Sequence, residues 1–241
     1  MQHPLCILFA LARESRPFLG YFPSKQRIRG GPVPAWQSDD TRDAALIVES
    51  GIGPDRAASA LCWLLRGFVP SAIVSAGFAG ALSCDLGVGD ILLADSVVDR
   101  ERNVWPASWP DTPKRSGFRV ARILSMPNVV GCPSEKRRLG DQFGAAAVDM
   151  ESATVARIST ERGITFGCLR VISDDAGTSL SKDMLDIVAG GSVSWVRLAH
   201  SVVRRPRVIP ELARLARHTR HAGERLAMAL LGMSDRNGSK E

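Results

Sequence analysis

Two apolar runs that each end in acidic residues constrain the fold of this chain more than any other feature. The run AAAV ends in the acidic segment 149–151, the run GCLRVI ends in the segment 173–175, and a helix-like segment, 152–162, separates them. Such a pattern predicts two buried strands joined by a helix. Ligands of open α/β sheets bind beyond the carboxyl ends of the strands, so we expect a small-molecule site built from carboxylates.

The rest of the chain repeats this alternation of apolar runs and helical periodicity. It predicts a single α/β domain over residues 1–233, a three-layer sandwich whose central, mixed and mostly parallel twisted sheet is flanked by helices. Residues 234–241 are predicted to form a disordered tail. The expected strands are 5–11, 44–49, 71–76, 91–98, 128–131, 145–148 and 167–172. One helix is expected to begin near Glu14. The other expected helices are 55–68, 134–142 (with Ser134 as N-cap), 152–162 and 209–233.

Residues 100–120 interrupt the alternation with three prolines and two tryptophans. We predict a long loop here. Loops of this length serve as binding loops or lids in some compact domains. A surface loop whose tryptophans pack back on the core is an equal alternative.

Positive charge is concentrated at the C-terminal end. The net charge is +6, but residues 200–241 hold nine Lys/Arg against four Asp/Glu and so carry most of it. Segment 209–233 has helical apolar spacing with arginines elsewhere, as in a basic amphipathic helix. We expect a docked helix with a solvated basic face, and keep contact with anionic lipid as the alternative. No nucleic-acid-binding module accompanies the charge.

The chain offers little chemistry other than that of carboxylates. Its four histidines lie near the two ends, and its five cysteines show no CxxC or metal-finger spacing. We therefore expect no metal, no disulfide framework and a reducing, cytoplasmic location. The N-terminal apolar run lacks a basic segment and a cleavage site, which favours a core strand over a signal peptide.

Five segments in order resemble a known family. SGIGPDRAA, SAIVSAGFAGAL, LGVGDILLADSVV, VDMES and RVISDDA, within residues 4–190, are similar to the purine nucleoside phosphorylase / methylthioadenosine–adenosylhomocysteine nucleosidase superfamily. The resemblance implies an enzyme that cleaves the N-glycosidic bond of a purine nucleoside, with adenine as the expected base. It also implies a homo-oligomer and no cofactor, with inorganic phosphate as the co-substrate if phosphate rather than water attacks.

The resemblance also implies roles for particular residues. Asp174 matches the acid at the purine N7, Glu151 the ligand of the ribose hydroxyls, and Glu14 the glutamate that activates water. Ser173 would orient Asp174, Met150 would pack on the sugar, and Arg170 could bind an anion. The backbone of Gly77, Phe78, Ala79 and Gly80 would line the ribose pocket.

Each of these positions also has a structural interpretation. Glu14 could be an ordinary acid of a first helical turn, favoured by the helix dipole. Arg170 lies inside an apolar run and could be a paired core arginine. Asp149 fits a helix N-cap better than a catalyst, and Gly51 and Gly53 could only form a tight turn.

One branch of the superfamily fits the remaining features. Phe78 and Ala81 replace residues that are commonly Ser and Gly, and the phosphate loop of some phosphorylases is absent. CPSEKRRLGDQFGAAAVDMES and the basic tail resemble the hopanoid-associated phosphorylases, which implies release of adenine from an adenosyl-hopane. The basic helix 209–233 would then contact the inner membrane peripherally.

Three alternatives remain from the sequence. The chain could be a methylthioadenosine/adenosylhomocysteine nucleosidase, or a non-catalytic nucleoside-binding relative at the membrane surface. A dinucleotide-binding oxidoreductase is disfavoured, because Arg56 stands where the third glycine of the Gly51–Gly53 motif belongs. Whether water or phosphate attacks the sugar is left open.

Overall fold

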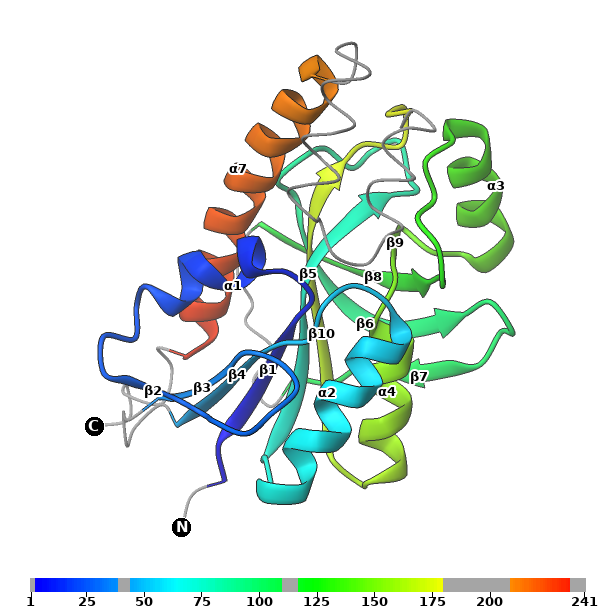
Figure 1. Cartoon of the computed structure of the whole chain (residues 1–241). Helices are drawn as coiled ribbons and strands as arrows, with labels where there is room; N and C mark the ends of the chain where they lie inside the picture. The colour runs from blue at the N-terminus through cyan, green and yellow to red at the C-terminus, as the bar shows by residue number, and fades with distance from the viewer. Residues whose placement is uncertain (1–2, 39–43, 110–116, 180–208, 235–241) are drawn as a thin grey trace, which may run out of the picture.

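A computed structural model describes residues 3–38, 44–109, 117–179 and 209–234 of the chain (Figure 1). Its helices cover both faces of a central sheet. The helices are α1 (Ala12–Leu19), α2 (Pro54–Gly67), α3 (Pro133–Phe143), α4 (Ser152–Glu161) and α7 (Ile209–Ser234). The strands are β1 (Leu5–Phe9), β2 (Lys25–Arg27), β3 (Ala35–Ser38), β4 (Ala45–Glu49), β5 (Ala72–Ala81), β6 (Ile91–Asp99), β7 (Val104–Pro106), β8 (Phe118–Ser125), β9 (Ala147–Asp149) and β10 (Thr165–Asp174).

Strand β5 organises the sheet. It pairs in parallel with β1 and β10 and antiparallel with β9, while β4 extends the parallel part beyond β1. Because β10 also pairs with β6, β6 with β8 and β8 with β9, these five strands close into a ring, and β3 and β2 form an antiparallel edge. The predicted fold class, a mixed sheet flanked by helices in one α/β domain, is confirmed.

Two apolar clusters sandwich the sheet. On one face α2 and α4 bury side chains such as Leu61 and Val155. On the other, α1 and α7 bury Phe18, Leu226 and Leu230. A third cluster packs α3 on β8 and β9. The α7 helix is therefore docked through an apolar face, as expected, and its Arg217 and Arg220 are exposed.

The strand preceding the first acidic segment, β9, runs in the opposite direction to its neighbour β5. β9 is antiparallel to β5 and pairs only with the last two residues of β5, Gly80 and Ala81. The chain after β9 consequently runs back along β5 towards Gly77. This reversal brings the acidic segment 149–151 over the middle of the sheet instead of placing it on a parallel neighbour of β10.

Three further local predictions are corrected. The glycine segment 77–80 continues strand β5 instead of forming a loop, because each of its residues pairs with β10. No strand covers 128–131; its place is taken by β8, at the end of the predicted long loop. Ser134 is not the N-cap of α3, because Cys132 takes that position and Pro133 opens the helix.

The segment 100–120 is partly ordered into the sheet. β7 pairs with β6, and Trp105 and Trp109 pack on the core, in line with the second interpretation of this segment. Residues 110–116 and the predicted disordered tail beyond Ser234 lie outside the described residues. No helix in the described part of the chain is long and apolar enough to cross a membrane.

Candidate functional site

Glu14 lies in the first turn of α1 with its carboxylate held by backbone. Its Oε2 accepts hydrogen bonds from the N–H groups of Ala10 and Leu11 at 2.9 and 2.8 Å, and its Oε1 accepts one from Phe78 at 2.8 Å. The residue is only 3% exposed. Burial raises the pKa of Glu14, while the backbone donors and the nearby Arg170 charge oppose that rise. The carboxylate is thus fixed in position with part of its charge stabilised.

Gly77 leaves the space that this carboxylate occupies. A Cβ built on Gly77 would lie 2.7 Å from Oε1 of Glu14, closer than real Cβ atoms approach any heavy atom. The backbone of β5 can therefore pass beside Glu14 only with glycine at this position.

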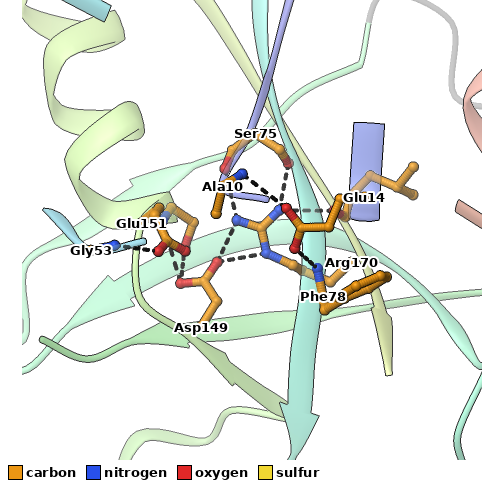
Figure 2. A network of polar contacts seen from close by, with 10 residues as sticks. Ala10, Glu14, Gly53, Ser75, Phe78, Asp149, Glu151 and Arg170 are labelled. Atoms are coloured by element: carbon orange, nitrogen blue, oxygen red, sulfur yellow. Dashed lines mark hydrogen bonds and ion pairs between the residues drawn. The ribbon is translucent and has the colours of Figure 1, made fainter. Parts of the chain in front are cut away.

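Arg170, in the middle of β10, is buried and fully partnered (Figure 2). Its Nε and Nη2 both donate to Oδ2 of Asp149, at 2.7 and 2.6 Å. Nη1 donates to the carbonyls of Ser75 and Leu169, and Nη2 also donates to the Ser75 hydroxyl. A guanidinium has five N–H donors, and all five are used here. This is the arrangement of a paired core arginine.

Asp149 joins this ion pair to the start of α4. Its Oδ1 accepts from the hydroxyl of Ser152 at 2.8 Å and from the Ser152 N–H at 3.3 Å. It therefore satisfies a donor of the first turn, as the predicted capping role requires, although Glu151 is the geometric N-cap.

Glu151 faces the same region from the opposite side. Its Oε1 accepts a hydrogen bond of 2.7 Å from the N–H of Gly53, in the turn before α2. Among the described residues no protein donor is recorded for its Oε2. Burial, and next the negative charge of Asp149, raise the pKa of Glu151 to about 8. Near neutral pH this carboxyl group can therefore both donate and accept hydrogen bonds.

A small cavity separates these groups. Glu14 and Glu151 line it together with Arg170, the Gly77–Phe78 backbone and the residues of β1 and β5 beneath. Its volume of about 10 Å³ is the size that holds one water molecule. The carboxyl groups of Glu14 and Glu151 thus line a space that holds a single water molecule.

Asp174, at the end of β10, is held in a different way. Its Oδ1 accepts from the Ser173 hydroxyl at 2.8 Å, and its Oδ2 accepts from the Lys136 ammonium at 2.5 Å. Its side chain is 14% exposed, whereas that of Lys136 is completely buried. A Cβ on Gly80 would lie 3.0 Å from Oδ2 of Asp174, so Gly80 makes room for this carboxylate much as Gly77 does for Glu14.

Strand β5 sets the separation between the carboxylates of Glu14 and Asp174. Glu14 lies against Gly77 and Asp174 against Gly80, three residues further along the strand. Three residues of extended chain span about 10 Å. The two carboxylates are therefore placed along one strand at a distance comparable to the length of a nucleoside.

The structure brings most of the predicted site residues together. Glu14, Glu151, Arg170, Gly77 and Phe78 line the cavity. Ala79, Gly80, Ser173 and Asp174 continue from it along the paired strands β5 and β10, with the Ser173 hydroxyl also donating to the Ala79 carbonyl. Met150 is half-buried between Asp149 and Glu151.

Three contributing residues were not predicted as site residues from the sequence, and Gly53 was expected only as part of a tight turn. Ser75 binds Arg170, Gly53 binds Glu151, and Lys136 binds Asp174. The sequence does indicate a core position for Lys136, because this residue shares helical spacing with Leu139 and Phe143 and so lies on the apolar face of α3. A lysine at a core position of an amphipathic helix calls for a partner.

The described residues contain no group of three or more His, Cys, Asp or Glu side chains that could hold a metal ion. The expectation that no cofactor is needed stays a prediction.

The chain is similar in sequence to known nucleosidases. It is 26% identical over 219 residues to the 5′-methylthioadenosine/S-adenosylhomocysteine nucleosidase of Actinobacillus succinogenes, covering 79% of this chain and 95% of that protein. The corresponding nucleosidase of Halalkalibacterium halodurans is 26% identical over 185 residues, covering 66% of this chain and 80% of its own.

Solved structures share the fold at lower identity. A Helicobacter pylori 5′-methylthioadenosine/S-adenosylhomocysteine nucleosidase complexed with a substituted pyrrolidin-3-ol aligns with a TM-score of 0.74 and 19% identity, over 97% of this chain and 98% of that one. The futalosine hydrolase of the same organism aligns with the same TM-score and identity, over 97% of both chains. The profile of the phosphorylase superfamily matches residues 9–118 and 113–204. The chain therefore belongs to the phosphorylase superfamily.

Proposed function

We propose that this protein hydrolyses the N-glycosidic bond of a purine nucleoside. One observation carries the proposal: two buried carboxyl groups, Glu14 and Glu151, line a cavity for a single water molecule. The acid Asp174 lies beside β5 three residues further along the strand than Glu14. Breaking this bond needs a nucleophile on one face of the sugar, a grip on the ribose and a proton for the leaving base. The site has a candidate group for each.

Glu14 is placed to accept a proton from the attacking water. A carboxylate has about four lone-pair positions, and three of them are used by the backbone donors. The remaining position faces the cavity, where one water molecule fits. As the water oxygen bonds to C1′ of the sugar, Glu14 takes up its proton.

Glu151 is placed to bind the ribose hydroxyls. Its Oε1 is fixed by the Gly53 N–H, and Oε2 is available to a ligand. As positive charge develops on the ribose, the nearby negative charge of Glu14 stabilises it electrostatically. Arg170 takes no direct part, and instead it fixes Asp149 beneath the site.

Asp174 is placed to protonate the base. Purine N7 becomes more basic as the glycosidic bond breaks, and a protonated purine leaves as a neutral molecule. The carboxylate is held by Ser173 and Lys136 and still reaches solvent, so a ligand can approach it.

Water is favoured over phosphate as the nucleophile. Phosphate needs cationic or N–H donors, but all five donors of Arg170 are occupied by protein atoms. The negative charge of Glu14 would also repel an anion. A cavity of one-water size fits the hydrolytic reaction better.

Two candidates remain for the group on the ribose 5′ carbon. The relatives named above act on methylthioadenosine and adenosylhomocysteine, which supports a thioether substituent. The sequence resemblance to hopanoid-associated phosphorylases, and the apolar Phe78 at the cavity, support a hopane lipid. In the second case the exposed arginines of α7 would also be available to an anionic membrane, and sedimentation with anionic vesicles tests that contact.

The proposal is tested by base release. Purified protein is incubated with 5′-methylthioadenosine, S-adenosylhomocysteine, adenosine and adenosyl-hopane, each with and without inorganic phosphate. We expect free adenine and a free sugar at a rate independent of phosphate. Formation of a sugar 1-phosphate only when phosphate is present would overturn the choice of water.

A matched variant separates an enzyme from a binding protein. Glu14→Gln keeps the size of the side chain but removes the base, so we expect turnover to fall by about 10²–10⁴ while nucleoside binding, followed by calorimetry, changes little. If no nucleoside of the panel is cleaved but several bind, the protein is a non-catalytic nucleoside-binding relative.

A further inference from the structure

Lys136 is a completely buried lysine whose ammonium group lies against the acid of the site. It projects from the apolar face of α3 and is 0% exposed. Its Nζ donates to Oδ2 of Asp174 at 2.5 Å, to the Asp175 carbonyl at 2.8 Å and to the Thr178 carbonyl at 3.5 Å. All three N–H donors of the ammonium have partners in the loop that follows β10.

Packing alone does not account for this lysine. Burying a charge is unfavourable even after relaxation, and a well-packed apolar residue of similar volume is often as stabilising or more so. The orientation of Asp174 does not require the lysine either, because Ser173 already binds its other oxygen. Asp174 is the partly exposed member of the pair, so it stands between the lysine and an approaching ligand.

We propose, on the basis of the proposed function, that Lys136 supplies through Asp174 the proton that the leaving purine takes up. The Nζ–H bond of Lys136 breaks as an O–H bond forms on Asp174, and an O–H bond of Asp174 breaks as N7–H forms. The C1′–N9 bond breaks and its electron pair stays with the purine. The purine leaves neutral, and Lys136 becomes a neutral amine.

The charges balance over the full reaction. The positive charge of Lys136 passes to the ribose, and water then adds to C1′ and gives its proton to Glu14. Glu14 releases that proton to solvent, and Lys136 takes one back before the next turnover.

The test compares three variants on two leaving groups. Lys136→Gln keeps hydrogen-bond donors but carries no ionisable proton, and Lys136→Met removes both. Ser173→Ala is the matched control, because it removes the other hydrogen bond to the same carboxylate. The substrates are the purine nucleoside that the wild type cleaves fastest and 4-nitrophenyl β-D-ribofuranoside, whose nitrophenolate leaves without a proton.

We expect kcat on the purine nucleoside to fall by about 10²–10³ in both Lys136 variants, within the range of general acid catalysis, with KM changed less than about threefold. The loss on the nitrophenyl riboside should stay below about tenfold, since this leaving group needs no proton. Ser173→Ala disturbs the orientation of Asp174 but leaves the Lys136 proton in place, so on the purine nucleoside it should lose less than either Lys136 variant. Rates are expressed per folded molecule, as determined by thermal unfolding.

Two results would overturn the inference: a Lys136→Gln variant with nearly wild-type kcat, or equal losses on both substrates in the Lys136 variants. In either case the wild type still releases purine, so the proposed function stands. A wild type that cleaves no purine nucleoside contradicts the proposed function itself.

Discussion

The two ends of the site hold their carboxylates by opposite means. At the cavity end, Glu14 is bound by three backbone N–H groups in a buried position. At the other end, Asp174 is bound by a hydroxyl and a buried ammonium and is partly open to solvent. Backbone amides fix a charge but do not give up a proton, whereas an ammonium group can. The difference suits a proton acceptor at the first end and a proton donor at the second.

The largest expected effect is a loss of kcat, and a change of leaving group distinguishes the proton acceptor from the proton donor. Asp174→Asn and Glu14→Gln should each lower kcat on a purine nucleoside by about 10²–10⁴. On 4-nitrophenyl β-D-ribofuranoside only Glu14→Gln should retain this large loss, because the nitrophenolate needs no proton while water still needs a base. Steady-state kinetics on both substrates measures this, and equal behaviour of the two variants would remove the distinction between the ends.

A smaller effect is expected from the two glycines of β5. Gly77→Ala should lower kcat by about 10–10², because its Cβ meets a carboxylate that three backbone bonds hold in place and a displacement of about 1 Å can cost that much. Gly80→Ala should lose less, since its Cβ meets the end of the Asp174 side chain at 3.0 Å.

Gly67→Ala is the control for this pair, because nothing lies within 4 Å of its Cβ position. The kinetics of all three variants are compared with their thermal unfolding. A larger loss at Gly80 than at Gly77 would show that the Asp174 end is the more rigid of the two.

The smallest expected effect concerns stability at the cavity end. The pKa of Glu151 is raised from its ordinary value of 4.5 to about 8 in the folded protein. At a pH between these two pKa values, the folded state holds a proton that the unfolded state has released. The free energy of unfolding should therefore fall as the pH rises towards 8. One unit of pKa shift corresponds to about 1.4 kcal/mol.

Glu151→Gln removes this titration. Relative to the wild type, the variant should gain at least about 1 kcal/mol between pH 5 and pH 8, measured by urea unfolding at both values. A difference between the two proteins that does not change with pH would contradict the raised pKa of Glu151.

Much of the site could be predicted because its residues lie where the sequence pattern changes. Glu151 and Asp174 each follow an apolar run, and the resemblance to a family pointed to Glu14 and to the glycine segment. Lys136 was not predicted, because the charged neighbours in its segment, SEKRRLG, obscure the helical spacing that it shares with Leu139 and Phe143. Only the packing of α3 shows that this lysine points inward to Asp174.

The sequence by itself determined the α/β class and the docked amphipathic helix α7, since these follow from local periodicity, and its resemblance to a family identified the acidic residues. Tertiary structure decided where the acidic residues lie relative to one another. The antiparallel course of β9 turned Glu151 back towards Glu14, and the pairing of β5 with β10 spaced Glu14 and Asp174 three residues apart. Strand direction, pairing and the partner of a buried charge depend on contacts between residues far apart in the chain, and local sequence patterns do not encode them.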